Sequence, residues 1–172
     1  DPVDPDIIFV HADSVYDNIP VVLNDGEVIL GEGVPHFIDV AGLANPIPLP
    51  RATAGVNRPL LQNTIGDAVT LANNSEFSGF SIVNTTGTAI SAIGVTNPSA
   101  NRNIIDTTNG PTSHGIFLQN ITGLALFEDN EISNIDGNAF FVQGGTANIV
   151  YSGSITNVTP PHGFAVLIEN NG

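Results

Sequence analysis

The sequence predicts an all-β solenoid, in which the chain winds into stacked coils, and three observations lead to this prediction. Short apolar runs recur every 21 to 26 residues, starting at Asp67, Thr88, His114, Asn138 and His162. Asn, Thr, Ser and Gly fill the polar positions, and these residues favour strands and turns over helices. The period is shorter than the about 40 residues of a propeller blade, and stacked coils form long parallel sheets. Because parallel crossovers are right-handed by default, we expect a right-handed parallel β-helix.

Residues 1–65 are expected to form one irregular N-terminal coil. The segments at residues 7–10, 21–23 and 27–30 have the composition of strands, and Asn24–Gly26 is a hairpin or tight-turn signal. The prolines of residues 44–55 exclude a helix there and predict a loop that leaves the coil. Residues 58–62 would return the chain to the wall, so that this coil and the rest of the chain form one continuous domain.

Residues 66–172 are expected to hold the regular coils. The first is GDAVTLANNSEFSGFSIVNTTG at residues 66–87, where V-T-L opens one wall and F-S-G-F-S-I builds the next. Successive coils should lie about 4.8 Å apart, which is the distance between paired strands. One apolar position per coil is then expected to form a column inside the solenoid, made of Val69, Ile90, Ile116, Phe140 and Phe164.

A polar residue follows the second strand of each regular coil, at Asn84, Asp106, Asn134 and Asn157. At equivalent turns of stacked coils, such a side chain can bond its local backbone and the matching side chain above and below. We expect these four residues to form a structural ladder. The alternative is that each of them is simply a good turn former.

The segments I-I-F-V and V-V-L-N-D-G-E-V-I-L-G-E-G, followed by G-D-A-V-T-L-A-N-N-S-E-F-S-G-F-S-I, resemble the first and standard coils of right-handed parallel β-helix proteins of the pectate-lyase-like superfamily. The resemblance covers nearly all of the chain and implies the fold. That superfamily includes polysaccharide lyases and hydrolases. The Asn-, Thr- and Gly-rich style also resembles segments of very large bacterial surface or secreted proteins, which are often passive.

The composition excludes several partners. Three basic residues stand against 17 acidic ones, for a net charge of −14, so the chain cannot build the basic patch that nucleic acid requires. No apolar run reaches the about 18 residues needed to span a bilayer, and no cysteine is present for disulfides. This acidic, lysine-free composition predicts an extracellular or cell-surface bacterial protein. The absence of Met predicts that the chain is a fragment of a longer one.

The best candidates for chemistry lie in F-E-D-N-E-I. A glycoside hydrolase needs two carboxylates about 5–10 Å apart, and on a strand Asp129 and Glu131 would share a face at about 7 Å, with Glu128 beside them. Phe127 and Tyr151 would offer a carbohydrate-facing surface if they point outward. The simpler interpretation is a solvated acidic edge, so no catalytic residue is assigned. A lyase would need a basic residue, and Arg102, the only one within the repeats, matches no motif.

No metal site or cofactor is assigned from the sequence. Calcium is the ion that the abundant oxygen ligands would suit, but no dedicated calcium-binding loop occurs. We therefore expect a non-enzymatic, structural or adhesive β-helix segment of a secreted or cell-surface protein. One alternative is a polysaccharide-binding or polysaccharide-degrading β-helix. Another is a self-assembling extracellular filament subunit, since an uncapped coil invites end-to-end pairing with another chain or continues into more of its own.

Overall fold

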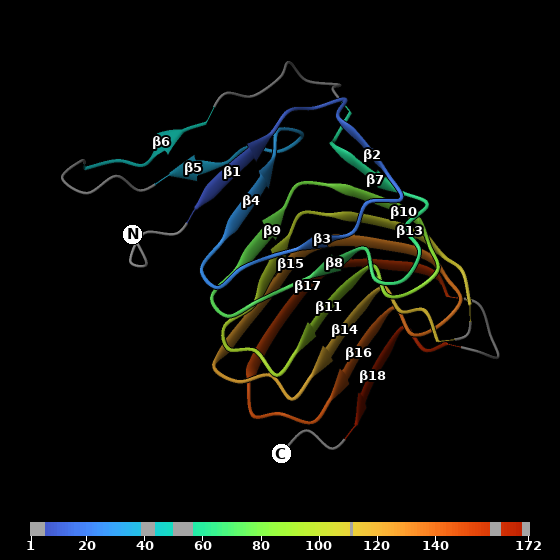
Figure 1. Ribbon diagram of the computed structural model, residues 1–172. Helices are drawn as coiled ribbons and strands as arrows, with labels where there is room; N and C mark the ends of the chain where they lie inside the picture. Colours follow the sequence, from blue (N-terminus) through green and yellow to red (C-terminus); the bar gives the residue numbers. More distant parts are fainter. Residues whose placement is uncertain (1–5, 39–43, 50–56, 111, 159–162, 170–172) are drawn as a thin grey trace.

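The computed structural model describes residues 6–38, 44–49, 57–110, 112–158 and 163–169. These residues form an all-β, parallel β-solenoid of about 6 turns, without a helix among them, as the sequence predicts. Figure 1 shows the coils stacked one on another, with β1 to β3 at one end and β17 and β18 at the other. Each coil contributes to three walls.

Wall 1 and wall 2 belong to one ten-stranded sheet, because β15 (Leu124–Ile135) and β17 (Asn148–Val158) run through both walls. Along the stack, wall 1 contains β1 (Ile7–Val10), β4 (Val28–Gly31), β9 (Glu76–Ser78), β12 (Ser99–Asn101) and the first parts of β15 and β17. Wall 2 contains β2 (Val15–Asp17), β7 (Leu60–Gln62), β10 (Ser81–Thr85), β13 (Ile104–Thr108) and the second parts of β15 and β17.

Wall 3 is a separate six-stranded sheet. In stack order it contains β3 (Val21–Val22), β8 (Val69–Thr70), β11 (Ile90–Ile93), β14 (Ile116–Gln119), β16 (Phe140–Gln143) and β18 (Val166–Glu169). Every pairing of wall 3 is parallel and in register from coil to coil, so a side chain meets its counterpart in the coils above and below. Alternate residues therefore face the interior along an entire wall.

Apolar columns run along the inside of each wall and fill the interior. Wall 2 contributes Leu61, Ile82, Ile105 and Ile132, each at most 1% exposed. Burial of such a side chain stabilises the fold by about 1.5–3 kcal/mol. The corresponding columns are Ile29, Phe77, Ala100 and Phe127 in wall 1, and Val69, Ile90, Ile116 and Phe140 in wall 3.

The predicted wall 3 column is wrong at its last member. Phe140 pairs with Val166, and Phe164 is 62% exposed. Phe164 lies instead at the position that Asn138 holds in the preceding coil. The N–H of Ala139 donates to the Phe164 carbonyl, just as the N–H of Gly115 donates to the Asn138 carbonyl. Ile116 and Phe140 are 24 residues apart, but Phe140 and Val166 are 26 apart. Alignment of the coils by their H-G pairs therefore placed the last coil two residues out of register. His162 lies outside the described residues.

The predicted ladder is wrong at Asp106, which lies one residue before the column that contains Asn84 and Asn134. Asp106 pairs with Val83 and Ser133, which places Thr107 rather than Asp106 in the column of Asn84 and Asn134. The members of this column share a left-handed backbone, with φ of 58° at Asn84, 60° at Thr107 and 55° at Asn134. Asn tolerates this conformation better than other non-glycine residues. Contacts between successive side chains are few: Asn134 Nδ2 donates to Asp106 Oδ1 at 2.6 Å. The side chain of Asn157 lies outside the described residues.

A second asparagine pair, which sequence reasoning missed, fills the corner between walls 1 and 2. Asn103 and Asn130 are both 0% exposed and lie on adjacent coils. Asn103 Oδ1 accepts the N–H of Phe80, and Asn130 Oδ1 accepts the N–H of Asn103, each at 3.0 Å. Asn130 Nδ2 donates to the Ala100 carbonyl at 2.8 Å. Buried amides that satisfy main-chain groups in this way hold the corner of these two coils.

The N-terminal region forms two coils rather than the single irregular one that was predicted for residues 1–65. β1, β2 and β3 make a complete first coil, and β4, β7 and β8 make the second. The Asn24–Gly26 turn is a corner rather than a hairpin, because β3 and β4 lie in different sheets. Gly26, with φ of 77°, donates its N–H to the Asn73 carbonyl at 2.7 Å. The second coil is interrupted by an excursion, residues 32–59.

The excursion carries the antiparallel pair β5 (Phe37–Ile38) and β6 (Ile47–Pro48), which projects from the stack beside β1 and β4 in Figure 1. Of the proline-rich loop predicted at residues 44–55, residues 44–49 are described and include β6. Val34 and His36 pack beside Gly79, which follows β9, and are 7% and 4% exposed. The excursion therefore covers part of the corner between walls 1 and 2.

Candidate functional site

The acidic residues proposed for hydrolysis lie at the corner between walls 1 and 2, not on a regular strand. Glu128, Asp129 and Glu131 are all exposed. Asp129 has a left-handed φ of 55°, and the pairing of β15 with β17 shifts register between Phe127 and Asn130. The strand geometry from which the separation of Asp129 and Glu131 was predicted is therefore interrupted. Asp129 is engaged by the next coil, because its N–H donates to Ser152 Oγ at 2.9 Å.

The aromatic residues proposed to face a carbohydrate are turned inward. Phe127 is 0% exposed, and Tyr151 stands in register with it and packs on Phe140 with ring centroids 4.6 Å apart. Burial raises the pKa of Tyr151 to about 12. Among the described residues, the Tyr151 hydroxyl has no hydrogen-bond partner. These two rings belong to the core and its end, and they provide no outer surface.

The outward aromatic residues lie on wall 3 instead. Ile116 and Leu118 point inward in β14, so Phe117 points outward, and Phe141 does the same one coil further along the stack. The two rings stack with centroids 5.0 Å apart and an interplanar angle of 28°. The His114 ring joins them, at 5.1 Å from Phe141 and 5.6 Å from Phe117.

Amide groups continue this surface along the same two strands. Gln119 Nε2 donates to Gln143 Oε1 at 2.6 Å, and both side chains are half-buried. Glu169 occupies the equivalent place on β18. We call His114, Phe117, Gln119, Phe141 and Gln143 the wall 3 platform. It combines fixed aromatic rings with side-chain amides, which can donate and accept hydrogen bonds.

His114 is held in its neutral form. Burial lowers the pKa of His114 below its ordinary value, and the Asp67 carboxylate partly raises it. Its Nδ1 accepts the N–H of Asn138 at 3.0 Å, so the ring carries its proton on Nε2. Asp67 and Asn138 make the same contact at equivalent positions, accepting the N–H groups of Thr88 and Phe164. His114 therefore links coils and also forms the edge of the platform.

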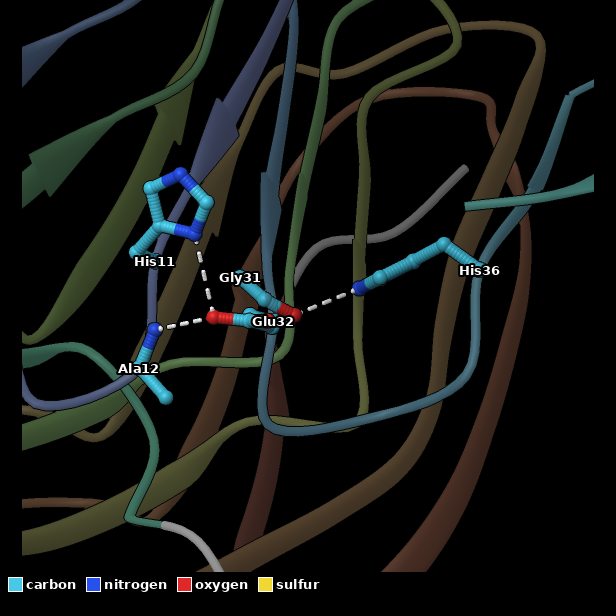
Figure 2. Close-up of polar contacts among 5 residues, drawn as sticks. All are labelled: His11, Ala12, Gly31, Glu32 and His36. Atoms are coloured by element: carbon cyan, nitrogen blue, oxygen red, sulfur yellow. Dashed lines mark hydrogen bonds and ion pairs between the residues drawn. The ribbon is translucent and has the colours of Figure 1, made fainter. Parts of the chain in front are cut away.

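A second polar region lies where the excursion leaves the stack (Figure 2). Glu32 Oε2 accepts the N–H of Ala12 at 2.9 Å and lies 3.2 Å from His11 Nδ1. His36 approaches from the opposite side, and its Nε2 lies 2.8 Å from the Gly31 carbonyl oxygen. Burial and the nearby Arg102 charge lower the pKa of His36, against the effect of the Gly31 hydrogen bond. These contacts fix the loop that follows β1 against the base of the excursion.

Metal and membrane features were also sought in the described part of the chain. No group of three or more His, Asp or Glu side chains there is arranged to hold a metal ion. No helix long and apolar enough to cross a membrane is found among the same residues. Comparisons with protein-family models, with curated proteins and with solved structures returned no match. The pectate-lyase-like resemblance and the bacterial, secreted origin therefore stay predictions.

Sequence reasoning missed the platform although a signal for it was present. In H-G-I-F-L-Q and N-A-F-F-V-Q, the aromatic residue that follows the core position occupies the outward place, and a glutamine follows two residues later in both coils. Strand alternation would have placed both phenylalanines outside once the core column was assigned. The same alternation puts Phe127 inside, because Ala125 is a core residue two positions before it.

Proposed function

We propose that this chain is a non-enzymatic, adhesive β-solenoid segment of a secreted or cell-surface protein, and that it holds a glycan against the wall 3 platform. The observation that carries the proposal is the outward stack of Phe117 and Phe141 beside the Gln119–Gln143 amide pair. Aromatic rings supply large apolar contact areas at small entropic cost. The amides can bond sugar hydroxyls, and the mutual stacking holds the rings in place before binding, which lowers the cost of association.

The environment of the acidic candidates supports a binding role over a hydrolytic one. Glu128, Asp129 and Glu131 are exposed at the corner between walls 1 and 2. The aromatic platform lies on wall 3, which is a separate sheet. A glycosidase acid needs a setting that raises its pKa. The resemblance to pectate-lyase-like β-helices and the acidic, lysine-free composition support the secreted, bacterial setting.

The test is binding on a glycan array and in affinity electrophoresis with soluble polysaccharides. The double variant Phe117→Ala, Phe141→Ala should lose the binding that the parent shows. Phe37→Ala is the matched control, because Phe37 is 62% exposed but lies on the excursion. Binding that persists in the double variant would refute the platform. Turnover of a polysaccharide, abolished by Asp129→Asn or Glu131→Gln, would refute the non-enzymatic assignment.

A second candidate function is end-to-end self-association, which is supported by apolar side chains on both outermost described coils. Ile8 is 43% exposed on the first coil, and Val166 and Ile168 are 49% and 59% exposed on the last, at positions whose counterparts in the adjacent coil are buried. Strand edges of this kind can pair with another chain. Light scattering over a concentration series should show growth that Ile8→Asp suppresses. A constant monomer mass at all concentrations would rule it out.

A further inference from the structure

A hollow of about 330 Å³ lies on the outer face of wall 2, over the first three coils. Its floor is apolar and is formed by Val15, Leu60 and Val83, which point outward because Tyr16, Leu61 and Ile82 point into the core. The volume falls in the range of small-molecule sites, which combine an apolar lining with a few polar groups. The hollow is remote from the wall 3 platform, since it lies on another wall.

Polar side chains surround this floor. Ser14 and Ser81 bring hydroxyl groups, and Asp13 brings a carboxylate whose Oδ1 accepts Asn57 Nδ2 at 3.0 Å. The loop that carries Asp13 and Ser14 is fixed by the Glu32 contacts shown in Figure 2. The fifth polar member of the lining is Arg58. Hydroxyl, amide and carboxylate groups are the partners that a hydroxylated ligand requires.

Arg58 is unusual because it lies near Arg102, the other arginine in the described ranges, and makes no ion pair with a described carboxylate. Its Nη1 donates to the main-chain carbonyl of Arg102, and Arg102 Nη1 donates to the carbonyl of Pro35. In the described ranges the single ion pair is His11 with Glu32, so neither guanidinium has a carboxylate within 4.0 Å, although the chain has 17 acidic residues. A guanidinium has five N–H donors, and each of these two uses one in a hydrogen bond.

Two half-buried cations near each other repel, and the carboxylates that act on them, Glu131 on Arg58 and Glu76 on Arg102, form no ion pair with them. Burial lowers the pKa of Arg58, the Glu131 carboxylate raises it, and the Arg102 charge lowers it further. This repulsion is offset when an anion binds Arg58, which is the arginine that lines the hollow. Such an anion would carry a single charge, because the Asp13 and Glu131 carboxylates stand close by and the chain as a whole is strongly negative.

We propose that the hollow binds a small monoanionic polyhydroxy acid. Its carboxylate lies on the guanidinium of Arg58, with Arg102 behind, its carbon chain lies over Leu60 and Val83, and its hydroxyl groups reach Ser14, Ser81 and the Asp13 carboxylate. Charge-assisted hydrogen bonds from a guanidinium are the strongest that the site can supply. The proposal does not depend on glycan binding at wall 3.

Titration calorimetry of the full chain with four probes tests this proposal. Gluconate should bind more tightly than acetate, which lacks the hydroxyls, and glucose, which lacks the charge, should show no saturation. Inorganic phosphate should bind no better than acetate, because its second charge meets Asp13 and Glu131. Equal heats for gluconate and glucose, phosphate binding that exceeds gluconate, or no saturable gluconate binding would each overturn the proposal.

Variants locate the site. Arg58→Gln should weaken gluconate about tenfold or more, the equivalent of losing one charged hydrogen bond. Glu131→Gln should tighten it, and the Phe117→Ala, Phe141→Ala pair should leave it unchanged. Arg58 also bonds the Arg102 carbonyl, so circular dichroism must show that the variant is folded. If it is not, Ser81→Val takes its place and should weaken gluconate but not acetate. Unchanged gluconate affinity in the folded variant tested would refute the assignment.

Discussion

The corners at the two ends of wall 2 both contain asparagine, but for different reasons. At the corner of walls 1 and 2, Asn103 and Asn130 are fully buried, and their amides satisfy main-chain groups of neighbouring coils. At the far end of wall 2, Asn84 and Asn134 are exposed and are there because their backbone is left-handed. Asparagine therefore acts by its side chain at one corner and by its conformational tolerance at the other.

The largest expected difference between the corners is in stability. Asn130→Ala should lower the free energy of unfolding by about 3 kcal/mol or more, because it leaves the Asn103 N–H and the Ala100 carbonyl buried without these partners. Asn134→Ala, the matched variant four residues later, should cost about 1 kcal/mol, because alanine is less favourable than asparagine in a left-handed conformation. The cost stays small because the Asn134 side chain is exposed. Urea unfolding monitored by circular dichroism measures both. Equal losses would contradict the distinction between the corners.

This difference also shows what the sequence could predict. The 21- to 26-residue period was sufficient for the fold, because in-register stacking requires apolar residues at repeating places. Asn103 and Asn130 were not recognised, because their corner lies inside apparently continuous strands, such as Leu124–Ile135. Asp106 was taken for a ladder residue because its side chain suits a turn, but the backbone turns at Thr107.

The candidate site was harder to predict than the fold. Phe117 and Phe127 both lie in apolar runs, and only the inward or outward phase of each strand separates a surface ring from a core ring. Arg58 and Arg102 are 44 residues apart in the chain, and the return of the excursion at residues 57–60 brings them together. No local pattern in the sequence encodes such a contact.

The second prediction concerns Thr107, the β-branched member of the left-handed column. Its φ of 60° is unfavourable for a β-branched residue. Thr107→Asn should therefore stabilise the protein by about 1 kcal/mol. The reverse exchange, Asn84→Thr, should destabilise it by a similar amount and is the matched control. Thermal unfolding of the two variants tests this, and a destabilised Thr107→Asn would show that Thr107 contributes more through its side chain than through its backbone.

A smaller effect is expected from His114, which precedes its strand of wall 3 at the position held by Asn138 in the next coil and by Asp67 two coils earlier. Its pKa is lowered from 6.5 by burial, so the unfolded chain binds more protons than the folded one below that value. Stability is fully present above pH 6.5 and falls as the pH drops towards the lowered pKa, because protonated Nδ1 cannot accept the Asn138 N–H. His36 adds to this loss in the same direction.

His114→Asn separates the two histidines. Asparagine occupies the equivalent position in the next coil and offers an acceptor oxygen without titrating. Unfolding measured between about pH 5 and 7.5, where histidine titrates, should show a shallower dependence on pH in the variant, with the remainder due to His36. His11→Asn changes a 77% exposed side chain and is the control. A pH dependence identical to that of the parent would show that His114 is not the group responsible.

The smallest expected change is at Glu76, on the outer face of wall 1. Burial raises the pKa of Glu76, whereas the Arg102 charge and the Asn101 hydrogen bond lower it. A carboxyl group with a raised pKa takes up protons on folding, so stability falls as the pH rises above its ordinary value of 4.5. Glu76→Gln removes that penalty and should increase the free energy of unfolding by about 0.5 kcal/mol at pH 7. Thermal unfolding should show this as a slightly higher unfolding temperature at pH 7 and a smaller increase near pH 4. A loss at pH 7 would mean that attraction to Arg102 outweighs desolvation, and the arginine pair would then already have its anion within the fold.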